Sequence, residues 1–377
     1  MNVRRLGLFG LLVLLVCMLA MQTSHIARAQ TKKEWEARLL ATDTYMREHM
    51  WNPANGNFIR RTDQPVTAQR SDSWGITIVL DAYATMIRTG NFKAADLRTY
   101  YDASTALYER TDNGTGARII ARQGSEIYVG GDDEMQWIAA LANCYTATQD
   151  SIYLRSAMGA FNAMIELGFW KQASADVPAG WSWNSNDRRP MGVSTSYGAL
   201  AAARLFAITK LDVYRTWAVV ALGALESPQI SFIPRDRMIA AEAAATLYEA
   251  THEMKFLGVA KWHATQALDI LASILAGKKE GERNPTDVGD LAEGLLMLSR
   301  DTYNTSYATK ARELVNYFFA KRTNEDIAAN GFYSRYSGAK LETPVLTGSY
   351  IGVPLSAKFL PEIAEMLKLE AEMMLAS

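Results

Sequence analysis

The chain has 377 residues, of which 49% are hydrophobic and 10% aromatic, and it carries 39 basic against 40 acidic side chains. This near balance, without a basic block, argues against nucleic acid as a partner. The four histidines, His25, His49, His252 and His263, do not have the spacing of a metal site, so neither a metal nor another cofactor is expected.

The first thirty residues have the pattern of a secretory signal peptide. Arg4 and Arg5 precede an apolar block that runs from Leu6 to Met21, and the small residues Ala27 and Ala29 follow. This order predicts cleavage after Ala29, which makes residues 1–29 a signal peptide. The apolar block is shorter than the ~20 residues of a membrane-spanning helix.

We therefore expect a secreted or periplasmic mature chain, residues 30–377, without stable membrane insertion. A lipoprotein signal is less favoured, because it needs a small residue before Cys17 and Val16 stands there. Residues 1–29 contain three arginines and no acid, which leaves 36 basic against 40 acidic side chains in the mature chain. Its cysteine, Cys144, lies among apolar residues and is expected to be buried and without a disulfide.

Apolar residues recur with a helical period along the rest of the chain, and no sustained period-two alternation appears. The fold class is therefore all-α. Helices are expected at roughly 34–50, 74–90, 97–110, 131–148, 151–166, 191–209, 212–225, 254–276, 286–300, 304–321 and 350–375.

Four stretches repeat one pattern in which a helix ends, a few polar residues turn, and the next helix begins. They are "CYTATQDSIYLRSA" (144–157), "LFAITKLDVYRTWA" (205–218), "LYEATHEMKFLGVA" (247–260) and "LSRDTYNTSYATKA" (298–311). In each, an aromatic residue is followed four residues later by Ala, so the two share a helical face and can interlock with a neighbouring helix. The aromatic residues are Tyr153, Tyr214, Phe256 and Tyr307. Their intervals of 61, 42 and 51 residues fit a helix hairpin as the repeating unit.

About twelve helices in six hairpins could form an open solenoid or close into an (α/α)6 barrel. Solenoid repeats keep a more uniform length, whereas these are joined by variable loops rich in Gly, Trp, Asn and Asp, such as 172–195. The pattern therefore favours a single closed barrel over residues 30–377, with its site among the variable loops at one end.

The stretch "IYVGGDDEMQW" (127–137) places three acids where a helix is expected to begin. Asp132 or Asp133 can cap this helix, and acids suit its positive end by about 0.3–1 kcal/mol each. A cap, however, needs only one aspartate. Two adjacent carboxylates crowd each other's charge, so one can hold a proton while the other stays ionised, as in the acid and nucleophile of retaining glycosidases. Glu134 is expected to be solvated or to make a polar contact.

Aromatic residues support a carbohydrate ligand, because several Trp and Tyr lie beside Gly, Asn and Asp rather than inside apolar runs. That placement suits a wet cleft that binds flat apolar faces and hydroxyl groups. A polysaccharide or oligosaccharide is therefore the expected partner.

These features resemble glycoside hydrolase family 76, the bacterial and fungal endo-α-1,6-mannanases with an (α/α)6 barrel. The family has adjacent aspartates, a Trp-rich helix and a hairpin of the "Y-x-x-T-x-D-x-x-Y-L" kind, and "DDEMQWIAALANCYTATQDSIYLRSA" (132–157) is similar. The resemblance extends over about residues 35–320 through "WNPANGNFIRR" (51–61), "SDSWGITIVLDAYATM" (71–86), "AGWSWN" (179–184) and "AAARLFAIT" (201–209).

The resemblance implies Asp132 as nucleophile and Asp133 as general acid/base in a retaining mechanism that needs no metal. It also implies a groove that binds sugar rings against aromatic planes. The substrate-binding candidates are Trp74, Tyr128, Trp137, Trp181, Trp183 and Asn184.

The chain departs from the family's pattern at Gln136, at Pro190-Met191 and at 235–238, where the family has a second Trp, a Lys-Asn-rich helix start and a Tyr-Asn-Gln-Gly motif. These departures leave two alternative functions open. One is an unsaturated uronyl hydrolase-like enzyme whose loop arginines bind an acidic sugar, although those arginines can equally lie in solvated turns or salt bridges. The other is a catalytically inactive glycan-binding barrel. The loop arginines are Arg188, Arg189, Arg235 and Arg237.

Overall fold

The computed structural model describes residues 32–54, 56–58, 73–111, 118–120, 129–230, 234–275, 285–302, 304–320, 368 and 370–375. The signal-peptide prediction falls outside these residues. Residues 32–377 form one compact unit, distinct from residues 1–31. Among the described helices, none has both the length and the apolar character needed to cross a membrane.

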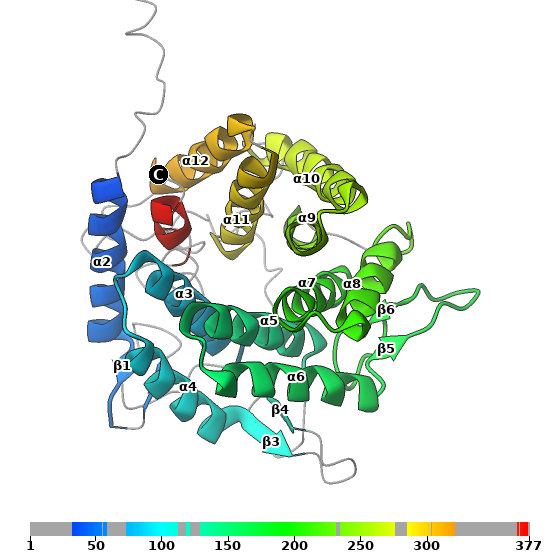
Figure 1. Cartoon of the computed structure of the whole chain (residues 1–377), viewed down its shortest axis with the longest axis horizontal. Coiled ribbons are helices and arrows are strands. Elements are labelled where there is room, and N and C mark those ends of the chain that lie inside the picture. The colour runs from blue at the N-terminus through cyan, green and yellow to red at the C-terminus, as the bar shows by residue number, and fades with distance from the viewer. Residues whose placement is uncertain are drawn as a thin grey trace, which may run out of the picture. The chain divides into compact units, whose positions relative to one another are not determined.

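The described unit consists mainly of helices (Figure 1). They are α2 (Lys32–His49), α3 (Ser73–Thr89), α4 (Ala94–Tyr108), α5 (Gly131–Thr148), α6 (Ser151–Glu166), α7 (Gly192–Thr209), α8 (Asp212–Ala224), α9 (Pro234–Thr251), α10 (Met254–Leu275), α11 (Pro285–Thr302) and α12 (Thr305–Ala320). Residues 368 and 370–375 are also helical and are called the C-terminal helix below.

The odd-numbered helices form an inner layer, since α3 packs against α5, α5 against α7, α7 against α9 and α9 against α11. Each is followed by an even-numbered helix that packs outside it, as α6 does on α5 and α10 on α9. Burial reflects this order: 13 of the 18 residues of α5 are buried, but only 6 of the 16 residues of α6. An inner helix is surrounded by neighbours, so buried residues occur on all of its sides.

The C-terminal helix takes the sixth inner position, between α3 and α11. Lys368 forms ion pairs with Asp81 of α3 and Glu293 of α11. Thr42 of α2 donates a hydrogen bond to Glu370. The ring of inner helices is therefore closed, as Figure 1 shows for the red segment beside α3 and α11.

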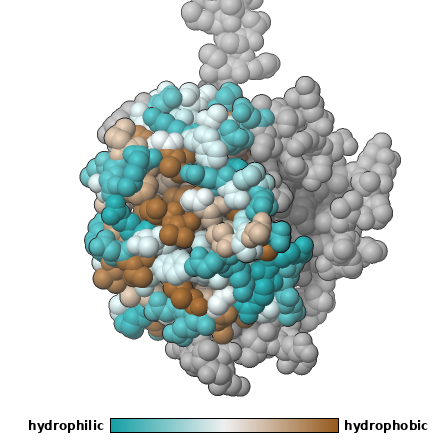
Figure 2. Space-filling view, turned by 90° about the vertical axis from the view of Figure 1, so that its right-hand side faces the viewer, coloured by the Kyte–Doolittle hydropathy of each residue, from teal (hydrophilic) through white to brown (hydrophobic). Residues whose placement is uncertain are grey.

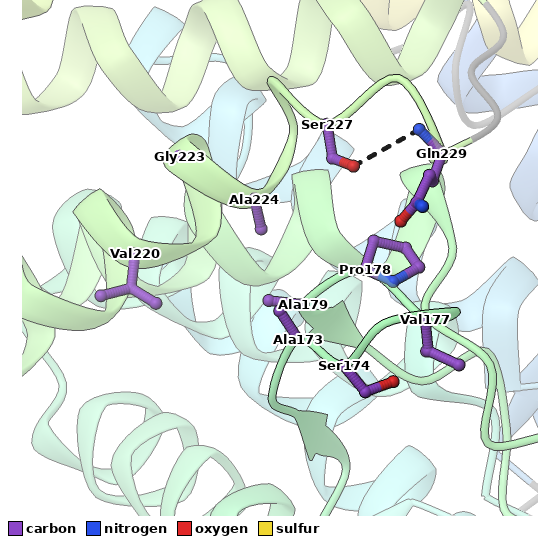
Figure 3. A pocket seen from close by; sticks show the side chains of 10 residues that line it. All are labelled: Ala173, Ser174, Val177, Pro178, Ala179, Val220, Gly223, Ala224, Ser227 and Gln229. Carbon is purple, nitrogen blue, oxygen red and sulfur yellow. Dashed lines mark hydrogen bonds between the residues drawn. The ribbon is translucent and has the colours of Figure 1, made fainter.

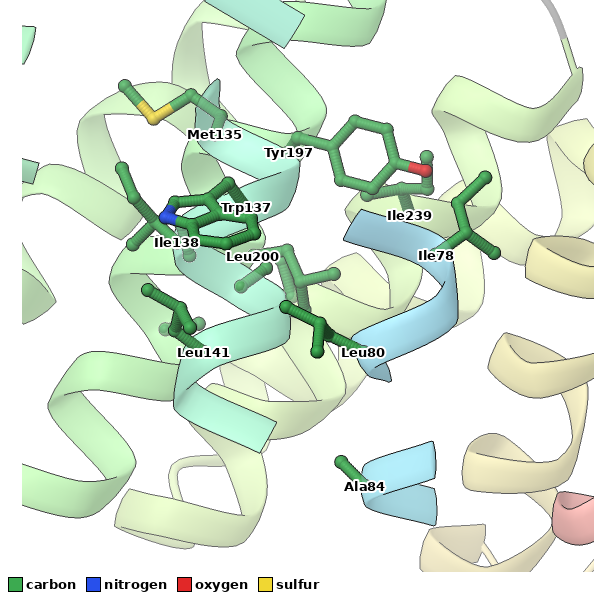
Figure 4. Packing of buried hydrophobic residues seen from close by; sticks show 14 of the residues in the cluster. Ile78, Leu80, Ala84, Met135, Trp137, Ile138, Leu141, Tyr197, Leu200 and Ile239 are labelled. Carbon is green, nitrogen blue, oxygen red and sulfur yellow. The ribbon is translucent and has the colours of Figure 1, made fainter. Parts of the chain in front are cut away.

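Large and small apolar side chains interlock between the inner helices (Figure 4). Ile78 and Leu80 of α3, Leu141 of α5 and Leu200 of α7 are all at most 3% exposed. The aromatic and Ala pairs of the sequence repeat are buried as expected at Tyr153/Ala157, Tyr214/Ala218 and Phe256/Ala260. In the fourth pair Ala311 is buried, while Tyr307 is partly buried and packs against the core.

At one end of the ring, inner helices pass to outer helices through one repeated turn. The residue after the helix has a left-handed conformation at Gln149, Lys210 and His252, with φ of 59°, 58° and 58°. The threonine before it donates its hydroxyl to the carbonyl four residues earlier and accepts an N–H from two residues later. This pair of bonds occurs at Thr148, Thr209, Thr251 and Thr302. It satisfies carbonyl and amide groups that a helix end leaves unpaired.

At the other end, the connections from outer to inner helices are longer, and three contain an antiparallel hairpin. The strands are β1 (Trp51–Asn52) with β2 (Asn57–Phe58), β3 (Glu109–Thr111) with β4 (Arg118–Ile120), and β5 (Trp170–Lys171) with β6 (Gly180–Trp181). The amino-terminal ends of the inner helices, including the start of α5, lie at this end.

The structure confirms the all-α class and the closed (α/α)6 barrel over the open solenoid. The helices at 131–148 and 151–166 have the expected bounds, and the others that are described agree within a few residues. The helix α9 was not among the expected ranges, because only its last residues, 247–251, fall within one of the four repeated stretches. Only the last residues of the helix expected at 350–375 are described.

Candidate functional site

The acidic pair lies in the first turn of α5, at the end of the ring that carries the long loops. The residue that caps α5 is Gly130, which has an extended backbone (φ −79°, ψ 119°) and makes no side-chain cap hydrogen bond. The N-cap position that the sequence suggests for Asp132 or Asp133 therefore belongs to Gly130. Both aspartates are instead the second and third residues of the helix, where its dipole favours ionised carboxylates.

The start of α5 is anchored by the loop that follows β6. The Gly131 N–H donates to the carbonyl of Trp183 at 2.5 Å, and Gly130 pairs with Asn184 in an isolated antiparallel bridge. A Cβ added at Gly131 would lie 2.0 Å from the Ser182 carbonyl oxygen, so this close approach requires glycine. The loop thus fixes the backbone immediately before the aspartates.

The three acids differ in exposure. Asp132 is partly exposed, whereas Asp133 is 4% exposed and Glu134 is fully buried. The Asp133 carboxylate packs over Gly130, where an added Cβ would lie 3.0 Å from its Oδ2 atom. Full burial rules out solvation of Glu134, so of its two interpretations the polar contact remains. The accessible acid and the covered acid are thus neighbours on one helical turn.

The tryptophan candidates separate into two groups. Trp183 is 41% exposed and lies directly beside the start of α5, and Trp74 is partly exposed in the first turn of the adjacent helix α3. Trp181 is completely buried and packs on Gly198 of α7 and on Trp170. Trp137 is 4% exposed, lies in the apolar cluster of Figure 4 and stacks on a tyrosine of α4. The prediction that Trp181 and Trp137 line a groove is wrong, because neighbouring side chains cover both rings.

The two other substrate-binding candidates are Asn184 and Tyr128. Asn184 is 5% exposed, and its Oδ1 accepts hydrogen bonds from the N–H groups of Asn186 and Asp187, so this oxygen holds the loop in shape. Tyr128 lies outside the described residues.

The loop arginines have structural partners. Arg188 lies over the Phe169 ring and donates to the Leu167 carbonyl, and burial lowers the pKa of its guanidinium. Arg189 pairs with Asp187, and these hydrogen bonds lower the pKa of that carboxyl to about 2. The salt-bridge interpretation therefore fits these two residues.

The arginines at the start of α9 also have contacts within the protein. Arg237 donates to the Leu225 carbonyl and lies over the Trp262 ring. Arg235 lies 3.8 Å from the carboxylate of Asp236. These contacts indicate structural roles for Arg235 and Arg237. Both residues lie at the end of the ring where α5 begins.

A surface groove of about 360 Å³ lies apart from the acidic pair, between the β5–β6 hairpin and the end of α8 (Figure 3). Small and apolar residues line it, with Ser174, Ser227 and Gln229 as its polar members. Figure 2 shows the side on which α8 and α10 lie, where apolar patches interrupt a polar surface. Exposed apolar residues of α8 and α10 include Val213, Val220 and Trp262. None of the site candidates lines this groove.

No group of three or more His, Cys, Asp or Glu side chains that could hold a metal ion occurs among the described residues. Cys144 is buried, and its thiol donates to the Leu80 carbonyl. Burial raises the pKa of this thiol well above its usual value. It is therefore a core residue, as its apolar surroundings in the sequence indicate.

Sequence reasoning did not identify Gly131 and Ser182 as determinants of the site. Ser182 is fully buried, and its hydroxyl donates to the carbonyls of Phe169 and Arg188, which ties the two ends of the loop together. The available signal was the pair of glycines that directly precedes the acids.

Comparison with known proteins shows the fold. No family model matches the chain, and a search of curated protein sequences found no match either. Among solved structures, a family 76 glycoside hydrolase (mannosidase) from Bacteroides thetaiotaomicron superposes with a TM-score of 0.69 at 13% identity, over 90% of this chain and 98% of that chain.

A second similar structure is an inactive variant of an α-1,6-mannanase from Salegentibacter, in which two consecutive aspartates are replaced by alanine, in complex with an α-1,6-linked mannotetraose. Its TM-score is 0.67 at 13% identity, over 91% of this chain and 99% of that one. A sugar epimerase from a ruminal bacterium also shares the fold, with a TM-score of 0.58 at 11% identity, over 77% of this chain and 87% of that one. The chain therefore has the (α/α)6 barrel of family 76 structures, and the fold alone does not define its chemistry.

Proposed function

We propose that the chain is an exported glycoside hydrolase of the retaining, endo-acting α-1,6-mannanase type, with Asp132 and Asp133 as its catalytic pair. The observation that carries this proposal is the placement of two adjacent aspartates in the first turn of α5, one partly exposed and one buried, at the end of the ring that carries the long loops. The consecutive aspartates replaced in the inactive Salegentibacter mannanase support the same pair.

The different exposure of the two acids suits the two roles. The partly exposed Asp132 carboxylate attacks the anomeric carbon, and the bond to the leaving oxygen breaks while Asp133 donates its proton to that oxygen. Asp133 then removes a proton from water, the water oxygen attacks the same carbon, and the Asp132 carboxylate leaves. Two inversions give a product with retained configuration.

Trp183 is the side chain proposed to hold a sugar ring beside Asp132. It is exposed, and its own carbonyl accepts the Gly131 N–H, so its position is tied to the start of α5. Trp74 in the first turn of α3 is the second candidate at this end.

Unbranched α-1,6-mannan tests the proposal directly. We expect the purified mature chain to release short oligosaccharides with retained anomeric configuration, measured by chromatography of the products and NMR of the fresh digest. Asp132→Asn and Asp133→Asn should each lower the rate at least about 100-fold. Asp212→Asn, in the first turn of the outer helix α8, is the matched control and should cleave at the parental rate.

Parental cleavage by folded Asp132→Asn and Asp133→Asn variants would exclude this catalytic pair. Binding of mannan oligosaccharides without turnover over a long incubation would favour the inactive glycan-binding barrel. Release of unsaturated uronic acid from lyase-treated polysaccharide would favour the uronyl hydrolase-like alternative. The structural partners of the loop arginines support a neutral over an acidic sugar.

A further inference from the structure

Six polar side chains, one from each inner helix, meet in a single cluster inside the ring. They are Asp81 of α3, Asn143 of α5, Arg204 of α7, Glu242 of α9, Glu293 of α11 and Lys368 of the C-terminal helix, together called the axial cluster. All except Arg204 are less than 9% exposed, and the Arg204 side chain is 14% exposed. The cluster plays no part in the proposed chemistry, because Asn143 lies ten residues after Asp133, about 15 Å along α5.

Two cations hold the cluster together. The Arg204 guanidinium lies 2.6 Å from Glu242 Oε1 and 3.4 Å from Asp81 Oδ1. The Lys368 amine lies 2.6 Å from Asp81 Oδ2 and 2.5 Å from Glu293 Oε2. Asn143 donates to Asp81 Oδ1 at 2.7 Å, so Asp81 links the C-terminal helix to α5.

The charge balance of the cluster depends on Lys368. Three carboxyl groups face two cations, and a buried charge is strongly unfavourable unless it is paired. If Lys368 is removed, Arg204 is the cation that the described residues leave beside Asp81 and Glu293, and Arg204 already contacts Glu242. The C-terminal helix therefore supplies a charge that the inner helices lack.

Other contacts of the C-terminal helix lie on α2 and α3. Glu370 accepts a hydrogen bond from Thr42, Glu372 pairs with Arg88, and the Met374 sulfur accepts from Asn91. In the Arg88 pair the arginine side chain is 33% exposed and that of Glu372 is 13% exposed. The ion pairs of Lys368 differ from these contacts, because they are buried and reach both neighbouring inner helices, α3 and α11.

We propose that the axial cluster is a latch that seats the C-terminal helix. Insertion of Lys368 between Asp81 and Glu293 fixes this helix as the sixth inner helix and closes the ring between α3 and α11. Loss of the amine releases the helix while the ring from α5 to α9 stays folded. This inference concerns closure of the barrel and does not depend on the proposed catalytic activity.

Native-state hydrogen exchange of the full chain, followed by mass spectrometry, tests the latch. In Lys368→Met we expect peptides covering 368–375 to exchange at least about 10-fold faster than in the parent, with unchanged rates in α6 and α8. Lys310→Met is the matched control, because Lys310 pairs with Glu313 on the exposed face of α12 and should leave residues 368–375 protected.

Glu293→Gln provides a milder second variant, which keeps the shape of the side chain and leaves Asp81 to pair with Lys368. It should accelerate exchange in the same peptides by a smaller factor, and it remains informative if Lys368→Met does not fold. Unchanged exchange of residues 368–375 in Glu293→Gln would overturn the latch. Equal acceleration throughout the chain in Lys368→Met would also overturn it, because that result indicates general destabilisation.

Discussion

Gly131 lies one residue before Asp132, and its Cα faces the Ser182 carbonyl oxygen with no room for a side chain. The same residue donates its N–H to Trp183. Both contacts are to backbone atoms, which cannot rotate away as a flexible side chain can. The direction in which α5 begins, and with it the position of both aspartates, therefore depends on the absence of one methyl group.

We expect Gly131→Ala to lower the free energy of unfolding by about 1–3 kcal/mol, because the new Cβ overlaps the Ser182 carbonyl. Gly159→Ala is the matched control, since a Cβ at this position in α6 meets nothing within 4 Å. That change should stabilise the protein by about 0.5–1 kcal/mol through helix propensity. Urea unfolding measures both. Equal effects of the two substitutions would show that α5 can shift away from the loop without loss.

At the scale of the helices, the repeated turn explains why the sequence repeat is visible at all. Each turn uses a threonine hydroxyl twice, once as donor to the helix and once as acceptor from the next segment. The left-handed residue that follows is not glycine at Gln149, Lys210 or His252, so the threonine and the packed aromatic–Ala pair define the motif. These local rules fix where the inner helices end.

Thr251→Val tests the contribution of this turn, because valine keeps the shape and removes both hydrogen bonds. We expect a loss of about 1 kcal/mol in the free energy of unfolding. Thr265→Val is the control: Thr265 makes the same bond to a carbonyl four residues earlier, Lys261, but accepts no N–H from a turn, and its effect should stay within about 0.5 kcal/mol. If the two variants unfold at the same urea concentration, the turn hydrogen bond contributes nothing measurable.

The sequence predicts most helices because period and turn chemistry are local properties. It does not reveal α9, since this helix begins with the charged run at 235–237 and continues as an alanine-rich segment without a distinct apolar stripe. The site is only partly predictable for a related reason. The acidic pair and its likeness to known glycosidases are visible in the sequence. The close approach of Ser182 to Gly131, however, joins segments about fifty residues apart, and Trp181 is buried by residues of other elements, such as Gly198 of α7 and Trp170 of β5.

At the scale of the whole ring, the axial cluster joins all six inner helices through charges removed from water. Burial and the neighbouring Glu293 carboxylate raise the pKa of Glu242 to about 8, although Arg204 and Lys368 act in the opposite direction. Burial also raises the pKa of Asp81, but Lys368 and Arg204 outweigh it and lower the pKa to about 2. The raised pKa favours a protonated Glu242 carboxyl at neutral pH, whereas Asp81 is ionised.

This proton makes the stability of the ring depend on pH. Glu242 holds it up to about pH 8 in the folded chain but only up to about pH 4.5 when unfolded, so stability falls as pH rises through this window and levels off above about pH 8. Asp81 contributes stability that is present above pH 3.8 and lost only as pH falls through about 2. His263, whose pKa burial lowers to about 3, is neutral in both states above about pH 6.5. Between pH 7 and 8, Glu242 is therefore the carboxyl of the axial cluster whose titration changes the stability, while Asp301 outside the cluster completes its own titration.

We expect the free energy of unfolding of the parent to fall by up to about 1.4 kcal/mol per pH unit between pH 7 and 8. Glu242→Gln should remove most of this slope, because glutamine resembles the protonated acid and cannot ionise. Asp301→Asn is the control: burial raises the pKa of Asp301 to about 7, but this residue lies outside the cluster, so the slope above pH 7 should remain. Urea unfolding at half-unit pH steps measures all three proteins. Parallel curves for the parent and Glu242→Gln would mean that the proton is held elsewhere and that the charge balance inside the ring differs from the one described.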